Sequence, residues 1–234
     1  MDRLDKILGG TGRYSRSEAR TLITGGLVSV DGRIVRKAEE KISRGSTVLV
    51  RGESVETAEF VYYMLNKPAD YISAVKDELY PAVTKLLPDF LQKRGLQPVG
   101  RLDVDVTGLL ILTDDGQTAH RLMSPKSGIR KVYEIYTDGP LLAEHCTLLA
   151  GGVTMRDGTQ YQPAQLVIDE NNDLHGFVSV TEGKYHEVKN LIAVCGRHIA
   201  SMSRIRIGEL TLDPELQPGQ GRFLSPEEIR RCFC

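Results

Sequence analysis

The sequence predicts an α+β fold, in which a small N-terminal module precedes a larger domain with a mainly antiparallel sheet. Segments with strand-like patterns outnumber helical ones, and the two kinds do not alternate regularly along the 234 residues. A doubly wound α/β fold requires that alternation, so it is disfavoured. The length suits one large domain or two unequal ones.

The N-terminal segment contains two helical patterns and a hairpin signal. Apolar residues recur with helical spacing over 2–8. Ser15 and Glu18 form a capping-box pattern that starts a second helix, which ends at a pair of glycines. Asp31-Gly32 between two apolar runs predicts a β-hairpin. A further strand is expected at 47–51.

Positive charge is concentrated in this segment. Residues 1–37 contain eight Lys or Arg and four Asp or Glu, although the whole chain has a net charge of −1. Arg13, Arg16 and Arg20 share the polar side of the second predicted helix. A basic segment on an acidic body is typical of docking to an anionic partner, although a solvated basic face has the same composition.

The module resembles the S4 RNA-binding domain, through its two short helices, its glycine pair at 25–26 and its Val30-Asp31-Gly32 hairpin. This resemblance implies an RNA-binding domain at 1–52, a linker at 53–59 and a second domain at 60–234. Such domains read RNA through phosphate neutralisation and shape. The residues expected to contact RNA here are basic: Arg3, Lys6, Arg13, Arg16 and Arg20.

The larger domain is predicted to mix strands with short helices. Alternating apolar patterns indicate strands at 60–65, 109–113, 131–136, 165–168, 176–180 and 203–208. Helical patterns occur at 82–87, 117–123, 140–150 and 185–195, and a last helix is expected to start at Ser225 with Pro226 in its first turn.

The segment Gly100–Leu109 carries the strongest indication of chemistry. It places Asp103 two residues after Arg101, in a glycine-bounded turn that leads into an apolar run. An aspartate in such a turn usually caps backbone groups. The spacing of Asp103, Asp105 and Thr107 also fits a phosphotransferase signature, which requires an apolar strand directly before its first aspartate. Pro98 and Gly100 stand at that place, so this alternative is disfavoured.

Five segments, in order, resemble the bacterial ribosomal RNA pseudouridine synthases that carry an S4 domain. Besides the S4-like module they are 62–73, the Asp103 loop, Lys131-Val132-Tyr133 and 182–189. The chain departs from the usual family residues at Ala69-Asp70, Glu187 and Asn190, where glycine, glutamine and arginine are common.

The resemblance implies the site and the chemistry. Asp103 is expected to act as nucleophile or base, Tyr133 to stack on the target uracil, and Lys189 to pair with Asp103. Asp105 is expected to be structural and to cap the turn. The sheet should be long and bent, with a central cleft. Further RNA contacts are expected from Arg101, Lys131, Lys184 and His186, while a wider basic rim would include Arg204 and Arg206.

The same resemblance predicts the biological setting. Isomerisation of uridine needs no redox cofactor or energy source, so no cofactor is expected, and no histidine spacing indicates a metal. The short tail and Tyr185-His186 favour the 16S over the 23S branch. We expect a cytoplasmic monomer that acts on ribosomal RNA in a partly assembled small subunit. A non-catalytic ribosome assembly factor with an inactive cleft is the alternative.

General features of the chain agree with this setting. The charged start lacks the apolar core of a signal peptide, and no apolar run approaches the roughly 20 residues that span a bilayer. The four cysteines lack metal-like spacing and are expected to be reduced.

Overall fold

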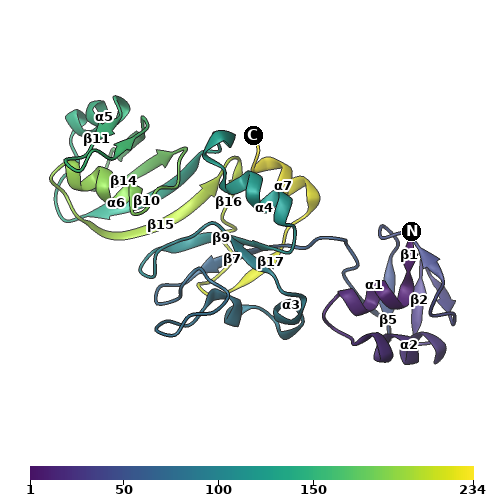
Figure 1. The fold of residues 1–234 in the computed structure, drawn as a ribbon. Helices are drawn as coiled ribbons and strands as arrows, with labels where there is room; N and C mark the ends of the chain where they lie inside the picture. The colour runs from purple at the N-terminus through teal and green to yellow at the C-terminus, as the bar shows by residue number, and fades with distance from the viewer. The chain divides into compact units, whose positions relative to one another are not determined.

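The computed structural model describes all 234 residues, which divide into two compact units (Figure 1). The first unit comprises residues 1–61 and 87–96, and the second comprises 62–86 and 97–234. No helix is both long and apolar enough to cross a membrane.

Two helices and a four-stranded antiparallel sheet form most of the first unit. The helices are α1 (Leu4–Gly10) and α2 (Arg16–Thr24). The sheet has the order β3-β2-β5-β6, with β3 at Arg33–Val35, β2 at Val28–Val30, β5 at Val48–Val50 and β6 at Glu53–Ser54. A separate pair joins β1 (Asp2–Arg3) to β4 (Lys41–Ile42). The unit also contains α3 (Asp89–Arg94).

The local signals at the N-terminus are confirmed. Ser15 accepts a hydrogen bond from the Glu18 backbone, and Glu18 accepts one from the Ser15 backbone, so both halves of the capping box are present. Asp31 and Gly32 both have positive φ, as a tight hairpin turn requires. Leu4, Leu8 and Ile23 are fully buried and belong to one apolar core with the sheet.

A nine-stranded sheet forms the centre of the second unit. Its main path runs β13-β14-β10-β15-β9-β7-β17, while β16 pairs with β15 and β8 pairs with β9. The bounds are β7 Tyr62–Lys67, β8 Gln97–Val99, β9 Thr107–Thr113, β10 Lys131–Thr137, β13 Gln165–Asp169, β14 Asn172–Val180, β15 Ile199–Ile207, β16 Leu210–Thr211 and β17 Gly221–Phe223. Every pairing except β9 with β15 is antiparallel, which confirms the predicted fold class.

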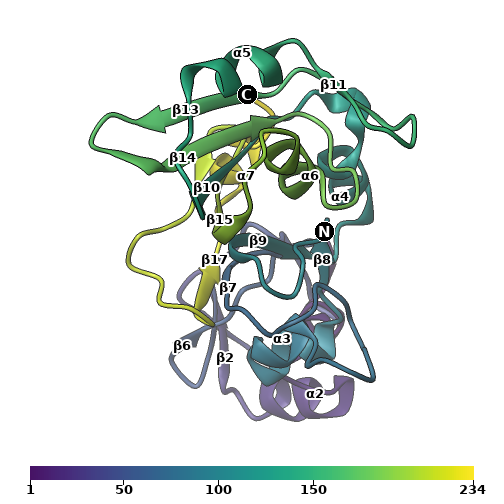
Figure 2. The ribbon, with the colours of Figure 1, turned by 90° about the vertical axis from the view of Figure 1, so that its left-hand side faces the viewer.

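Short helices surround this sheet. They are η1 (Val83–Leu86), α4 (Gly116–Met123), η2 (Pro125–Ser127), α5 (Ala143–Ala150), α6 (Glu187–Val194) and α7 (Pro226–Arg231), and a small hairpin joins β11 (Val153–Thr154) to β12 (Gln160–Tyr161). Figure 2 shows α5 beside β13 and β14. Leu122 of α4 and Ile229 of α7 share an apolar core with Met64 and Ile111 of the sheet.

The one parallel pairing lies at the middle of the sheet and depends on a glycine. Arg204 of β15 is opposite Gly108 of β9. Gly108 has φ +99°, and a Cβ there would lie 2.4 Å from the Arg204 carbonyl oxygen. Only glycine therefore allows the two backbones to approach this closely. The loop that carries Asp103 leads directly into β9 at this point.

The segment before Asp103 differs from the sequence-based prediction. Pro98 and Gly100 predict no strand there, yet Gln97–Val99 forms β8 and pairs antiparallel with β9. Proline is tolerated because β8 has β9 as its sole partner and so lies at an edge. The expected phosphotransferase arrangement is a parallel strand before the aspartate, and β8 is antiparallel.

Candidate active site

Asp103 lies in the loop between β8 and β9, with one carboxylate oxygen facing a lysine and a histidine side chain. Its Oδ2 lies 3.0 Å from Nζ of Lys189 and 3.3 Å from Nε2 of His186. Lys189 is on α6 and His186 is the residue that precedes this helix. The Asp103 side chain is 30% exposed, so the group is accessible from solvent.

The backbone on both sides of Asp103 is held by buried polar side chains. Nζ of Lys67, which is completely buried, donates to the carbonyl oxygens of Val106 at 2.7 Å and Val104 at 3.2 Å. Oγ of Ser73 lies 3.0 Å from both the nitrogen and the oxygen of Leu102. The loop is therefore fixed before and after the aspartate. Burial lowers the pKa of Lys67 to about 8.

Lys189 is shared by two carboxylates. Its Nζ donates to Oδ1 and Oδ2 of Asp105 at 2.8 and 2.9 Å, in addition to its contact with Asp103. Burial lowers the pKa of Lys189, but the hydrogen bonds to Asp105 and Asp103 outweigh burial and raise it overall. Burial is the largest single influence on the pKa of Asp105 and raises it, but the hydrogen bond and charge of Lys189, with smaller contributions, together lower it overall. Asp105, which we expected only to cap the turn, is thus a partner of Lys189.

Tyr133 of β10 and Asp103 line the same pocket, which has a volume of about 360 Å³. Tyr133 is 9% exposed, so most of its side chain is covered by the protein. The charged lining is predominantly basic, since Asp103 is accompanied by Arg101, Lys131, Lys184, His186 and Arg204. A pocket with one carboxylate among cations suits a polyanionic ligand.

The basic residues expected to contact RNA differ in whether other groups of the protein already hold their side chains. Arg101 is exposed at the pocket, whereas Nζ of Lys131 donates to the Glu182 carbonyl oxygen at 2.8 Å. Burial, with a smaller effect of Arg204, lowers the pKa of Lys131. Lys184 forms an ion pair with Glu182 at 2.9 Å. Lys131 and Lys184 therefore brace the 182–186 segment as well as lining the pocket.

Glu187 is a buried carboxyl group at the site, and its burial could not be predicted from the sequence. It is 5% exposed and lines a smaller cavity together with Asp103 and Tyr133. Burial, and then the neighbouring charge of Glu182, raise the pKa of Glu187 to about 7.

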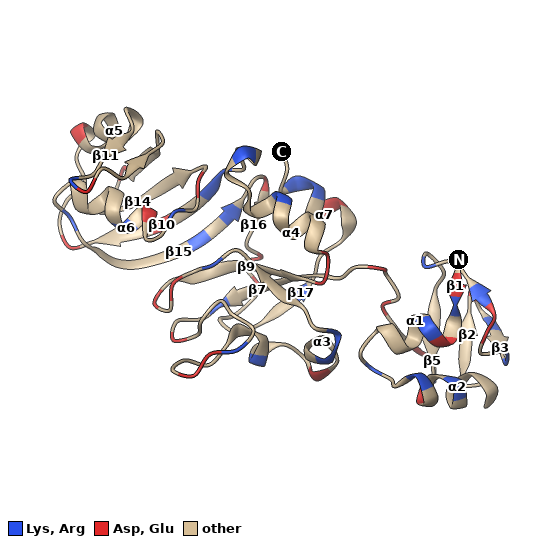
Figure 3. Ribbon diagram, in the orientation of Figure 1, with Lys and Arg blue, Asp and Glu red and all other residues tan.

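The candidate RNA-binding residues of the first unit fall into two groups. Arg3 and Arg20 are engaged with Asp5, which is completely buried: Nη2 of Arg3 and Nε of Arg20 each lie 2.9 Å from its Oδ2. The hydrogen bond from Arg3 is the largest cause that lowers the pKa of Asp5 to about 2. Lys6 and Arg16 form longer ion pairs, at 3.3 Å with Asp2 and 4.0 Å with Asp5, and the Arg13 guanidinium lies 4.0 Å from the centre of the Phe90 ring without a carboxylate partner among the ion pairs. Figure 3 shows the basic positions on α1 and α2.

Comparison with known proteins identifies the second unit. Residues 61–193, more than half of the chain, match the RNA pseudouridylate synthase family, and residues 2–48 match the S4 domain. The chain belongs to the RNA pseudouridylate synthase family. It is therefore an isomerase that converts uridine to pseudouridine in RNA, and the resemblance inferred from its motifs is confirmed.

Similar proteins span the whole chain. An uncharacterised RNA pseudouridine synthase of Bacillus subtilis is 37% identical and covers 97% of this chain and 96% of its own length. A ribosomal small subunit pseudouridine synthase A of Escherichia coli is 36% identical, with coverages of 97% and 98%. A pseudouridylate synthase of known crystal structure has 32% identity and a TM-score of 0.69, over 99% of this chain and 100% of the other.

Family membership leaves the phosphotransferase interpretation without support. Sequence reasoning missed two residues that build this synthase site, Lys67 and the buried Glu187, whereas Arg204, expected in a wider basic rim, lines the pocket. The signal of the two missed residues was weak because a lysine or a glutamate in a strand or helix is usually solvated.

Proposed function

We propose that this synthase isomerises one uridine of 16S ribosomal RNA in the small subunit, with Asp103 as the catalytic carboxylate. The observation that carries the proposal is the position of Asp103, accessible in a basic pocket beside Tyr133 and 3.0 Å from Lys189. The full-length similarity to proteins named ribosomal small subunit pseudouridine synthase A supports the choice of subunit.

The reaction rearranges bonds without net gain or loss of atoms. The C1′–N1 bond of uridine breaks, the uracil turns over, and a C1′–C5 bond forms. C5 then loses its proton and N1 gains one. Asp103 acts either as a nucleophile at C1′ or as a base on the ribose, and both roles require an ionised carboxylate at the sugar. Lys189 is its counter-ion, and His186 approaches the same oxygen.

Tyr133 is proposed to hold the base. A nucleotide within a helix must be everted to reach a pocket, at a cost of a few kcal/mol, and stacking on an aromatic ring offsets this cost. Tyr133 is the one aromatic side chain shared by both cavities that contain Asp103.

The N-terminal unit is proposed to dock on the ribosomal RNA, with domain boundaries at 1–52 and 60–234. Lys6, Arg13 and Arg16 supply cations for phosphate contacts, and Arg3 and Arg20 brace α1 against α2 through Asp5. We propose a monomeric enzyme whose substrate is a partly assembled small subunit.

The test uses carbodiimide primer extension, which stops at pseudouridine. Wild-type protein is incubated with unmodified 16S transcript, unmodified 23S transcript and small-subunit particles from cells that lack the enzyme. A single stop in 16S RNA, strongest in the particle, is expected. A stop only in 23S RNA would overturn the choice of subunit, and no stop in any substrate would favour an assembly factor.

A further inference from the structure

Arg204 is a buried arginine with an unused hydrogen-bond donor at the floor of the pocket. It is 3% exposed, and its Nη2 has no partner. Buried polar groups are nearly always hydrogen-bonded, because an unsatisfied one, particularly a charged one, is costly. An acceptor that enters the pocket with the substrate would remove this cost.

The direction of this donor is fixed by the fold. Nε of Arg204 donates to the Leu109 carbonyl oxygen of β9 at 2.9 Å, which anchors the guanidinium group. The residue directly opposite on β10 is Tyr133, so the two side chains lie on the same face of the sheet. Both line the pocket that contains Asp103.

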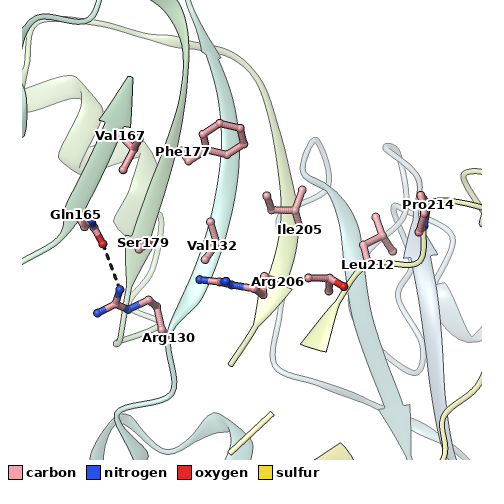
Figure 4. Close-up of a pocket in the computed structure, with 11 residues that line it drawn as sticks. Arg130, Val132, Gln165, Val167, Phe177, Ser179, Ile205, Arg206, Leu212 and Pro214 are labelled. Carbon is pink, nitrogen blue, oxygen red and sulfur yellow. Dashed lines mark hydrogen bonds between the residues drawn. The ribbon is translucent and has the colours of Figure 1, made fainter. Parts of the chain in front are cut away.

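A β-bulge separates Arg204 from its neighbour Arg206. The register changes between Val132 and Tyr133, so that Arg206 is opposite Val132 and Arg204 is opposite Tyr133, with Ile205 unpaired between them. Arg206 consequently lies on the other face, in a separate cavity with Val132 and Ile205 (Figure 4). The two arginines, which we had grouped in one rim, therefore have different surroundings.

We propose that Arg204 recognises the target base by donating its Nη2–H to a ring carbonyl oxygen of uracil. This inference rests on the proposed function, in which Tyr133 stacks on that base. A phosphate is a poorer candidate, because the exposed Arg101 is available for the RNA backbone nearer to solvent. Uracil has carbonyl acceptors at both C2 and C4, on either side of N3.

This arrangement suits the turnover of the base. When N1 and C5 exchange places, C2 and C4 also exchange places, so a fixed donor meets a carbonyl oxygen before and after the rearrangement. Cytosine keeps the carbonyl at C2 but has an amino group at C4, which is a donor and cannot accept from Arg204. A fixed Arg204 donor would therefore meet an acceptor in both orientations of uracil but in only one orientation of cytosine, which favours uridine over cytidine.

The test compares Arg204→Lys and Arg204→Met with the matched control Arg206→Met, on RNA with uridine, 2-thiouridine or 4-thiouridine at the mapped target. Sulfur accepts hydrogen bonds more weakly than oxygen. Wild type and Arg206→Met should lose about 10-fold in single-turnover rate with at least one thio substrate. With the uridine substrate, the Arg204 variants should already react about 10-fold more slowly than wild type. Their rates should not fall further when that thio substrate replaces uridine.

An equal thio penalty in wild type and both Arg204 variants would overturn the inference, since a purely structural role slows all substrates alike. Full activity of Arg204→Met on uridine would also overturn it. Thermal melts identify a variant that fails to fold, and Arg204→Lys retains the charge if Arg204→Met does not fold. Failure of the proposed function itself is distinct, because wild type would then form no pseudouridine.

Discussion

At the scale of single residues, the site depends on one ammonium group that forms ion pairs with two carboxylates. Lys189 lies within 3.0 Å of both Asp103 and Asp105. Two carboxylates that face one another without a cation repel, and this favours protonation of one of them. The lysine thus allows two neighbouring anions to coexist in an accessible site.

Replacement of Lys189 should therefore move the acid side of the pH–rate profile. The hydrogen bond from Lys189 lowers the pKa of Asp105, so its loss in Lys189→Met raises the pH at which Asp105 ionises beside Asp103. We expect the acid limb to shift to higher pH, as for other carboxylates that lose a cationic partner. Single-turnover rates measured from about pH 4, near the ordinary pKa of an aspartate, upward follow this limb. Lys189→Arg retains the charge and is the control, and an unshifted limb in Lys189→Met would contradict the account.

Glu187 should make folding stability fall with rising pH. Its pKa is raised from 4.5 to about 7, so the folded state holds a proton that the unfolded state has lost between these values. Stability is therefore unaffected below about pH 4.5, declines up to about pH 7 and stays reduced above it, by up to about 3 kcal/mol.

Glu187→Gln removes this titration. The variant should melt several degrees higher than wild type at pH 8, since about 1 kcal/mol shifts the melting temperature by about 3 °C in a domain of this size. At pH 5 the two proteins should melt alike. An equal rise in melting temperature at pH 5 and pH 8 would show that the buried negative charge of Glu187 is not the cause.

At the scale of elements, most helices and strands were predictable from local pattern. The capping box at Ser15, the hairpin at Asp31-Gly32 and the strand at 131–136 follow from short-range chemistry, and each is present. Strands β8 and β17 were missed because each is only three residues long and gains its order from pairing with β9 or β7. Three residues are too few to show the alternation of apolar and polar side chains that identifies a strand.

The candidate site was predictable only in part, for a similar reason. Asp103, Tyr133 and Lys189 stand in motifs that resemble those of a known family. Lys67 holds the loop by donating to backbone carbonyl oxygens, and Arg204 donates to one such oxygen while its Nη2 has no partner. The spacing of residues in the sequence does not reveal contacts of this kind. The bulge that turns Arg206 away from the pocket is likewise a property of pairing between β10 and β15.

The loop that carries Asp103 should depend on Lys67 more than on any surface residue. Lys67→Met leaves the carbonyl oxygens of Pro68, Val104 and Val106 without this donor. We expect a loss of roughly 3 kcal/mol in the free energy of unfolding, since hydrogen bonds to a charged group contribute about 1.5–3 kcal/mol each and are not additive. Urea denaturation measures it, with Ser73→Ala as a milder comparison. Unchanged stability and full activity would show that the loop is held by other contacts.

At the scale of the whole molecule, the chain combines an electrostatic RNA-binding module with a separately folded catalytic unit. Each unit has its own core. Binding through phosphates is sensitive to salt, whereas the isomerisation step is set by the pocket. The two contributions should therefore be separable by mutation.

Neutralising Arg13 and Arg16 should weaken RNA binding without slowing turnover at saturation. The double variant Arg13→Gln/Arg16→Gln should reduce the dependence of log K on log salt by about 2, one per lost phosphate contact. Filter binding across a salt series measures this slope. Arg33→Gln is the control, because Arg33 is already paired with Glu40. Identical slopes for the double variant and wild type would mean that α2 does not face the RNA.

The proposed reaction requires the carboxylate of Asp103. The most direct measurement is tritium release from C5-labelled uridine in 16S RNA by wild type and Asp103→Asn, with RNA affinity and melting temperature measured in parallel. We predict that the variant folds, binds RNA within about 2-fold of wild type, and releases tritium at less than about one thousandth of the rate. Tritium release at the wild-type rate would contradict the account.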